Sequence, residues 1–204
     1  MEQTPNNYPD AVEELIAALR KLPGIGRRSA ERMALGLLKF PAEELRLFGE
    51  TLSTLPDRIG SCPVCGNLTE AHELCSICSS PRRDESTICV VEDFTRIAGI
   101  EKSGGFHGLY HVLGGRLSPL DDESEDTLHI NALEKRLESG KVKELILALG
   151  GDVESRATAI YLARKFENKV EKITKLAQGL PAGGDLAYAD SATILAALNG
   201  RNTL

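Results

Sequence analysis

The sequence predicts a multi-module α+β protein with four successive parts. These are a helical N-terminal module, a four-cysteine metal module, an α/β domain with a mostly parallel sheet, and a short C-terminal helical segment. Three observations predict this order. Apolar residues recur at helical spacing between residues 9 and 55, four cysteines lie between residues 60 and 84, and strand-like and helix-like runs alternate after residue 87.

The N-terminal part combines helices with a glycine-rich turn. Apolar periodicity predicts helices over residues 9–21, 27–39 and 42–55. The segment Leu22-Pro23-Gly24-Ile25-Gly26 separates the first two, because its proline and glycines interrupt a helix and let the backbone turn sharply. This arrangement is typical of a helix-hairpin-helix, in which the second helix begins with free N–H groups that can bind phosphate.

Basic residues gather around this hairpin. Residues 20 to 40 contain six basic side chains and one acid, although the whole chain has a net charge of −6. Such a local reversal of charge favours contact with the sugar–phosphate backbone, independent of base sequence. The alternative is an ordinary helical hairpin with a solvated basic face. The predicted DNA-binding residues are Lys21, Gly24, Gly26, Arg27, Arg28 and Arg32.

The cysteines follow the pattern C-x2-C-x9-C-x2-C. Two such pairs complete a tetrahedral shell of four thiolates around one structural zinc ion, with no open position for water. The predicted ligands are Cys62, Cys65, Cys75 and Cys78. Cys89 lies in an apolar run, where a buried core thiol is the alternative to a ligand, and His72 is a further candidate ligand within the zinc loop.

The remainder of the chain alternates strands and helices. Strands are predicted at residues 87–91, 109–113, 145–149 and 173–177, and helices at 127–139, 153–168 and 190–199. This alternation favours parallel strands joined by right-handed crossovers. Asp190 or Ser191 is the expected cap of the last helix.

Carboxylates follow two of these strands. Glu92 ends the first, and Asp152 and Glu154 follow Gly150-Gly151 after the third. Such acids are able to converge on Mg²⁺ at the carboxyl edge of a sheet, as in a Mg²⁺-dependent nuclease or phosphotransferase. The alternative is an acidic surface for partners, to which Asp121, Asp122 and Glu123 add charge. The sequence has no P-loop motif.

The first residues of the chain and its hydropathy indicate the compartment of the cell in which we expect the protein. The first ten residues are polar and lack the basic and apolar regions of a signal peptide, and no apolar run approaches the roughly 20 residues of a membrane span. We therefore expect a cytoplasmic protein, in which reduced cysteines bind metal instead of forming disulfides.

The order of these modules resembles the RecR family of bacterial recombination mediators. The resemblance spans nearly the whole chain and includes the hairpin, both cysteine pairs and four further motifs. These are Pro81-Arg82-Arg83-Asp84, Cys89-Val90-Val91-Glu92, Leu117-Ser118-Pro119-Leu120-Asp121 and Gly179-Leu180-Pro181-Ala182-Gly183-Gly184. Two positions depart from the family pattern, where Arg156 and Ala187 stand in place of acids.

The resemblance implies a non-enzymatic DNA-repair protein. It implies a helix-hairpin-helix module over residues 1–58, a zinc finger over 59–84, a Toprim domain over 85–180, and a C-terminal oligomer segment over 181–204. It also implies binding of single- and double-stranded DNA, RecO and in some systems RecF as partners, and loading of RecA onto single-stranded DNA by a ring-like dimer or tetramer.

Within that family the acidic Toprim surface contacts RecO, which makes Glu92, Asp152 and Glu154 the expected partner-binding residues. We also expect the zinc ion to fasten the helical module to the Toprim domain. Two alternatives stay open, a Mg²⁺-dependent Toprim nuclease or phosphotransferase and an adaptor that does not contact DNA.

Overall fold

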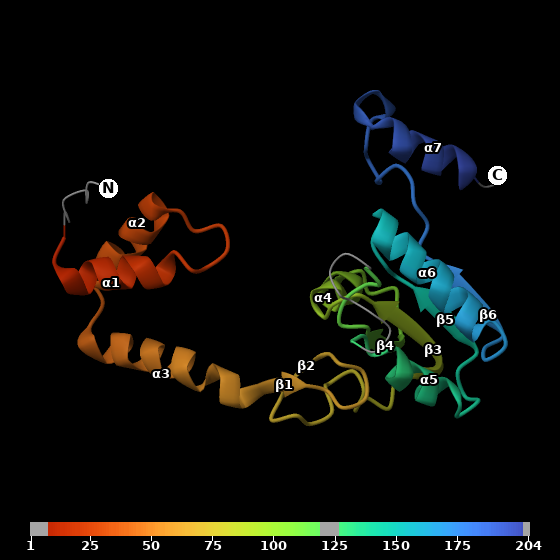
Figure 1. Ribbon diagram of the computed structural model, residues 1–204, viewed down its shortest axis with the longest axis horizontal. Coiled ribbons are helices and arrows are strands. Elements are labelled where there is room, and N and C mark those ends of the chain that lie inside the picture. Colours follow the sequence, from red (N-terminus) through yellow and green to blue (C-terminus); the bar gives the residue numbers. More distant parts are fainter. Residues whose placement is uncertain (1–7, 119–126, 202–204) are drawn as a thin grey trace. The chain divides into compact units, whose positions relative to one another are not determined.

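The structure is a computed structural model that describes residues 8–118 and 127–201 (Figure 1). The chain divides into two compact units, Met1–Arg58 and Ile59–Leu204. The predicted acids Asp121, Asp122 and Glu123 lie outside the described residues. None of the helices in the described ranges is long and apolar enough to cross a membrane.

The first unit contains three helices, α1 (Asp10–Leu19), α2 (Arg27–Leu37) and α3 (Ala42–Arg58). Its small core consists of Ile16 from α1 and the alanines Ala30 and Ala34 from α2. Because alanine side chains are short, α1 and α2 pack closely on either side of the hairpin turn. The three predicted helices are confirmed, and α3 continues further than expected, to Arg58.

The second unit begins with the metal module. The strands β1 (Ile59–Ser61) and β2 (Leu68–Glu70) pair antiparallel and flank the first cysteine pair. The sequence prediction missed both strands. Each has only three residues and neither has a fully buried residue, so no alternating apolar pattern marks them.

A four-stranded parallel sheet forms the centre of this unit. Its order is β4 (Gly108–Val112), β3 (Asp84–Val91), β5 (Glu144–Leu147) and β6 (Lys172–Lys175), and all three pairings are parallel. The four predicted strands are confirmed. Figure 1 shows β3 and β5 as the inner strands, which places the end of β3 beside the loop that follows β5.

Alternate residues of the sheet face two separate cores. Ile88, Val90 and Leu145 join a cluster with α5 (Ile130–Leu137) and α6 (Val153–Phe166). On the opposite face, residues such as Cys89 and Val91 join a cluster with α4 (Thr95–Lys102) and the cysteines of the metal module. The metal module therefore forms part of the layer that covers one face of the sheet.

The C-terminal part contains a short 3-10 helix, η1 (Leu186–Tyr188), and α7 (Ser191–Asn199). The Asp190 carboxylate accepts hydrogen bonds from the N–H groups of Ala192 and Thr193, both at 2.9 Å, which confirms Asp190 as the helix cap. The α4 helix was not predicted, because it is short and contains Gly99, which weakens the helical signal.

Candidate metal centre and nucleic-acid interface

The four cysteines of the metal module converge on one point. Their Sγ atoms all lie within 4.8 Å of one another, and Cys65 Sγ is 3.5 Å from Cys75 Sγ. A tetrahedral zinc ion with Zn–S bonds of about 2.3 Å places its sulfurs roughly 3.8 Å apart. The observed cluster therefore fits zinc, and Cys62, Cys65, Cys75 and Cys78 are the residues that would hold it.

The backbone supports these sulfurs. Gly66 has a φ of 76° and donates to Cys62 O at 2.9 Å, which closes the first turn. The N–H groups of Asn67 and Cys78 lie 3.5 Å from the sulfurs of Cys65 and Cys75 respectively. Hydrogen bonds to sulfur stabilise the thiolate form that binds metal, and a closed four-thiolate shell serves structure and not catalysis.

The two other candidate ligands have different environments. His72 does not belong to the cluster, and its ring covers Gly60 so closely that a Cβ there would lie 2.3 Å from Nδ1. Cys89 is buried in the sheet, and this burial raises the pKa of its thiol to about 12. The interpretation of Cys89 as a core thiol is confirmed.

The hairpin presents its backbone to solvent. Gly24 has a φ of 76°, and no atom of the described residues lies within 4 Å of the position that a Cβ would occupy. The first hydrogen bond of α2 runs from Ala30 N–H to Gly26 O at 3.0 Å, and the side chains described around this helix do not cap its start. The N–H groups that open α2 therefore have no partner within the helix and point outward.

The basic residues of the hairpin fall into two groups. Arg27 forms ion pairs with Glu13 at 3.2 Å and Glu31 at 2.9 Å. The hydrogen bond to Glu31, with the charge of Glu13, raises the pKa of Arg27. Arg28 and Arg32 are exposed, lie one helical turn apart on α2, and form no ion pair within the described residues.

The acids of the sheet edge are tied together by a serine. Glu92 Oε1 accepts the Gly150 N–H at 2.7 Å and lies 2.5 Å from the Ser155 hydroxyl. The same hydroxyl lies 2.8 Å from Oδ2 of Asp152, whose Oδ1 accepts the Ser155 N–H at 2.9 Å and caps α6. These hydrogen bonds from Ser155 lower the pKa of Asp152 to about 2.

These acids are also paired with cations. Arg96 lies 4.0 Å from Glu92, and Arg116 lies 3.6 Å from Asp152. Within the described residues, the four cysteines are the sole group of three or more potential ligands close enough to share a metal ion. The structure thus brings Glu92 and Asp152 together but does not gather Glu92, Asp152 and Glu154 around one cation position.

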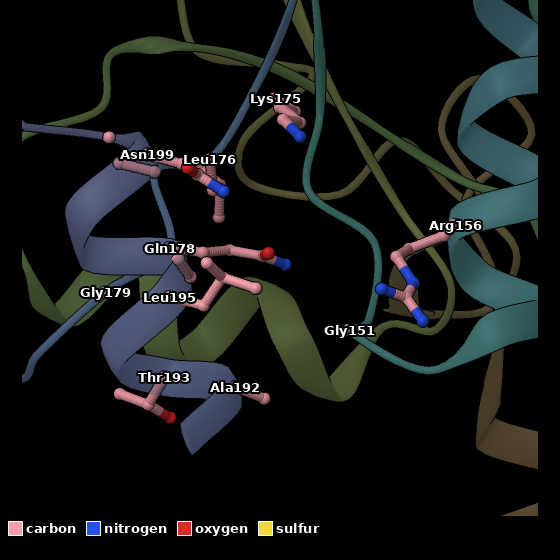
Figure 2. Close-up of a pocket in the computed structure, with 13 residues that line it drawn as sticks. Gly151, Arg156, Lys175, Leu176, Gln178, Gly179, Ala192, Thr193, Leu195 and Asn199 are labelled. Atoms are coloured by element: carbon pink, nitrogen blue, oxygen red, sulfur yellow. The ribbon is translucent and has the colours of Figure 1, made fainter. Parts of the chain in front are cut away.

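A hollow of about 820 Å³ lies beside these acids (Figure 2). Gly151 and Arg156 line one side, and Lys175, Gln178 and residues of α7 line the others, and none of the lining residues that the structure describes is acidic. In Figure 2 the side chains of Arg156 and Gln178 extend into this space from opposite sides. The sequence does not predict this hollow, because its lining combines positions from residue 151 to residue 200 and no local pattern marks it.

Comparison with known proteins matches the whole arrangement. Family models match residues 12–55 (RecR, helix-hairpin-helix), 59–80 (RecR, four-cysteine zinc finger domain), 86–177 (Toprim domain) and 179–202 (RecR, C-terminal). The chain is 48% identical to Recombination protein RecR of Acidothermus cellulolyticus over 97% of this chain and 98% of that protein. The protein of the same name from Moorella thermoacetica is 45% identical over the same shares. The chain therefore belongs to the RecR family of recombination proteins.

Proposed function

We propose that the protein is a DNA-binding recombination mediator in DNA repair. It holds single- and double-stranded DNA independently of sequence and, with RecO and in some systems RecF, helps to load RecA onto single-stranded DNA. The observation that carries this proposal is the exposed pair of Arg28 and Arg32 in the first two turns of α2, next to its uncapped N-terminus. Guanidinium groups and free backbone N–H groups together suit phosphate oxygens.

The charge of the chain determines how this binding works. The net charge is −6, so a single copy offers a weak attraction to DNA. If several copies place their hairpins on one DNA molecule, their combined attraction to the DNA is stronger than that of one copy. Support for such a homo-oligomer comes from α3, which has no buried residue and exposes Leu47, Phe48, Leu52 and Leu55. A run of exposed apolar side chains of this kind marks an interaction surface.

The partner surface is proposed at the acidic edge of the sheet. Asp152 is exposed and stays ionised, and Glu154 is half-buried beside it at the start of α6. Glu92 is 7% exposed, so its proposed part is to hold the Asp152 loop in place through Ser155 and Gly150. Asp152 and Glu154 would then make the direct contacts with a partner such as RecO.

Substitution of Arg28 and Arg32 tests the proposed DNA contact. We expect Arg28→Ala with Arg32→Ala to weaken binding to labelled single-stranded and duplex DNA at least tenfold at low salt, measured by fluorescence anisotropy, because two guanidinium groups no longer reach phosphates. Arg27→Ala should have a smaller effect, since Glu13 and Glu31 already neutralise this guanidinium.

The control is Arg164→Ala with Lys135→Ala, which removes the same two positive charges from exposed positions of α6 and α5. Equal losses in this control and in Arg28→Ala with Arg32→Ala would show that net charge, and not the hairpin, determines affinity. Unchanged affinity in Arg28→Ala with Arg32→Ala would refute the proposal.

A further inference from the structure

Arg136 of α5 is a half-buried cation that forms no ion pair with a carboxylate of the described residues. Its Nη1 donates to Tyr110 O at 2.6 Å and lies 3.3 Å from His111 Nδ1. Removing a guanidinium from water is costly unless a negative charge compensates it, so the position of Arg136 requires an explanation.

The neighbouring histidine does not supply this charge. His111 is 2% exposed, and its Nε2 lies 2.9 Å from His129 O. Burial, together with the charge of Arg136, lowers the pKa of His111 to about 3, so the imidazole is neutral at pH 7. Both of these contacts of Arg136 are therefore with uncharged acceptors.

The charges of the metal-binding sulfurs act on Arg136. Burial lowers the pKa of Arg136, and attraction to all four cysteines opposes this shift. The backbone explains their proximity, because β4 is an edge strand of the sheet. Val112 N–H donates to Cys65 O at 2.7 Å, and two residues earlier Tyr110 O accepts from Arg136.

The same edge of β4 therefore binds the first cysteine pair and the guanidinium. Tyr110 and Val112 also share a buried cluster with Cys62, Cys65 and Cys75. Four thiolates around one Zn²⁺ carry two net negative charges, which are costly to bury without a nearby cation. The guanidinium and the first cysteine pair thus bind neighbouring backbone groups of the same strand edge.

We propose that Arg136 is the counter-charge of the zinc centre. Its guanidinium offsets the net negative charge of the four-thiolate shell, which raises the affinity for zinc and links α5 to the metal module. Arg136 is a positioning residue and binds no metal itself. Loss of zinc would leave this cation without compensation, so metal loading also stabilises the packing of α5 against β4.

Zinc affinity tests this proposal directly. The zinc-loaded full-length chain and its variants are titrated with a chromophoric chelator, and the zinc dissociation constant is obtained by competition. We expect Arg136→Gln to weaken zinc binding at least tenfold, within the range of about 10–100-fold known for residues that surround metal ligands. Arg136→Lys should retain most of the affinity, because it keeps the charge.

The matched control is Lys135→Gln, which removes one positive charge from an exposed position on the same helix. Its zinc affinity should equal that of the wild-type chain. An unchanged affinity in Arg136→Gln, or equal losses in Arg136→Gln and Lys135→Gln, would overturn the proposal.

A second comparison separates charge compensation from packing. Cys78→His reduces the net charge of the shell by one, and Cys78 is the least buried ligand. We expect Arg136→Gln to cost several-fold less zinc affinity in this background than in the wild-type chain. An equal cost in both backgrounds would show that Arg136 acts through packing alone.

If Cys78→His does not bind zinc, the comparison is made instead with the four-cysteine chain loaded with iron in place of zinc. Its Fe³⁺/Fe²⁺ reduction potential should then be lower in Arg136→Gln than with Arg136 present, because a nearby cation favours the more negative reduced centre. An unchanged potential would refute the proposal.

Discussion

At the level of single residues, Arg83 shows how the metal module is joined to the sheet. Its guanidinium pairs with both carboxylate oxygens of Glu101 and donates to the carbonyls of Phe106 at 3.3 Å and Gly108 at 3.4 Å. Tyr110 donates to the same Glu101 carboxylate at 2.7 Å. One half-buried ion pair thus connects the segment before β3 with α4 and β4.

Replacing Glu101 by Gln should destabilise the protein in a pH-dependent way. The hydrogen bond and charge of Arg83 lower the pKa of Glu101, so the ionised form stabilises the fold above the unfolded value of about 4.3. This contribution disappears as pH falls through the lower folded pKa. We expect Glu101→Gln to cost about 1–3 kcal/mol at pH 7 in urea denaturation.

The difference in unfolding free energy between the wild-type chain and Glu101→Gln should then shrink below about pH 4. Asp84→Asn serves as a comparison. The pKa of Asp84 is also lowered, but its hydrogen-bond partners Ser86 and Thr87 are uncharged and Asp84 lies on an exposed surface. A cost for Glu101→Gln that does not change with pH would contradict the role assigned to this ion pair.

Some residue roles were predictable from sequence and others were not. The zinc ligands follow from their spacing, because a pair separated by two residues directs both sulfurs to one point. The ion pair between Arg27 and Glu13 was not predictable, since these residues lie on different helices. The bridge that Ser155 forms between Glu92 and Asp152 depends on two neighbouring strands and has no local signal.

At the level of elements, the turn after the first cysteine pair connects the metal site to the sheet. Gly66 adopts a positive φ, and a Cβ at this position would lie 3.1 Å from Val112 Cβ. Gly140, in the turn after α5, has a similar φ of 68° but no atom of the described chain within 4 Å of its Cβ position. The two glycines therefore have the same backbone conformation and different packing.

Alanine at each glycine separates these effects. We expect Gly140→Ala to cost about 1–2 kcal/mol of unfolding free energy from the left-handed conformation alone. Gly66→Ala should cost more and should also reduce zinc affinity, because Val112 must move and this residue binds Cys65 O. Denaturation of the zinc-loaded chain and chelator competition measure both quantities. Equal costs and an unchanged zinc affinity would contradict close packing at Gly66.

The elements that sequence analysis predicted are those with long apolar patterns. The strands β3 to β6 and the helices α1, α2, α3, α5, α6 and α7 have such patterns, whereas Gly99 interrupts the pattern of α4 and weakens its helical signal. The strands β1 and β2 form around the first cysteine pair and owe their position to the metal module more than to their own side chains. Metal ligation thus specifies structure that residue propensities do not encode.

At the level of the whole molecule, the exposed apolar face of α3 predicts self-association. We expect the wild-type chain to have a mass in solution, by light scattering, of at least twice the 22.0 kDa of one chain. Phe48→Glu with Leu52→Glu should lower this mass, because charged side chains would replace apolar contacts.

Glu50→Gln provides the control, since it changes an exposed polar position of the same helix. A wild-type mass of one chain, or an unchanged mass in the double variant, would show that α3 is not the contact surface. The role of zinc in fastening the helical module to the Toprim domain stays a prediction, although the cysteines do pack against the sheet.

Contact between the hairpin arginines and the DNA backbone is the basis of the proposed function, and the salt dependence of binding tests it. Removal of one phosphate contact with single-stranded DNA reduces the slope of log affinity against log salt by about 0.7. For Arg28→Ala with Arg32→Ala we therefore expect the slope to fall by about 1.4 per chain engaged. A slope equal to that of the wild-type chain would contradict the proposed function, because the two guanidinium groups would then not touch phosphate.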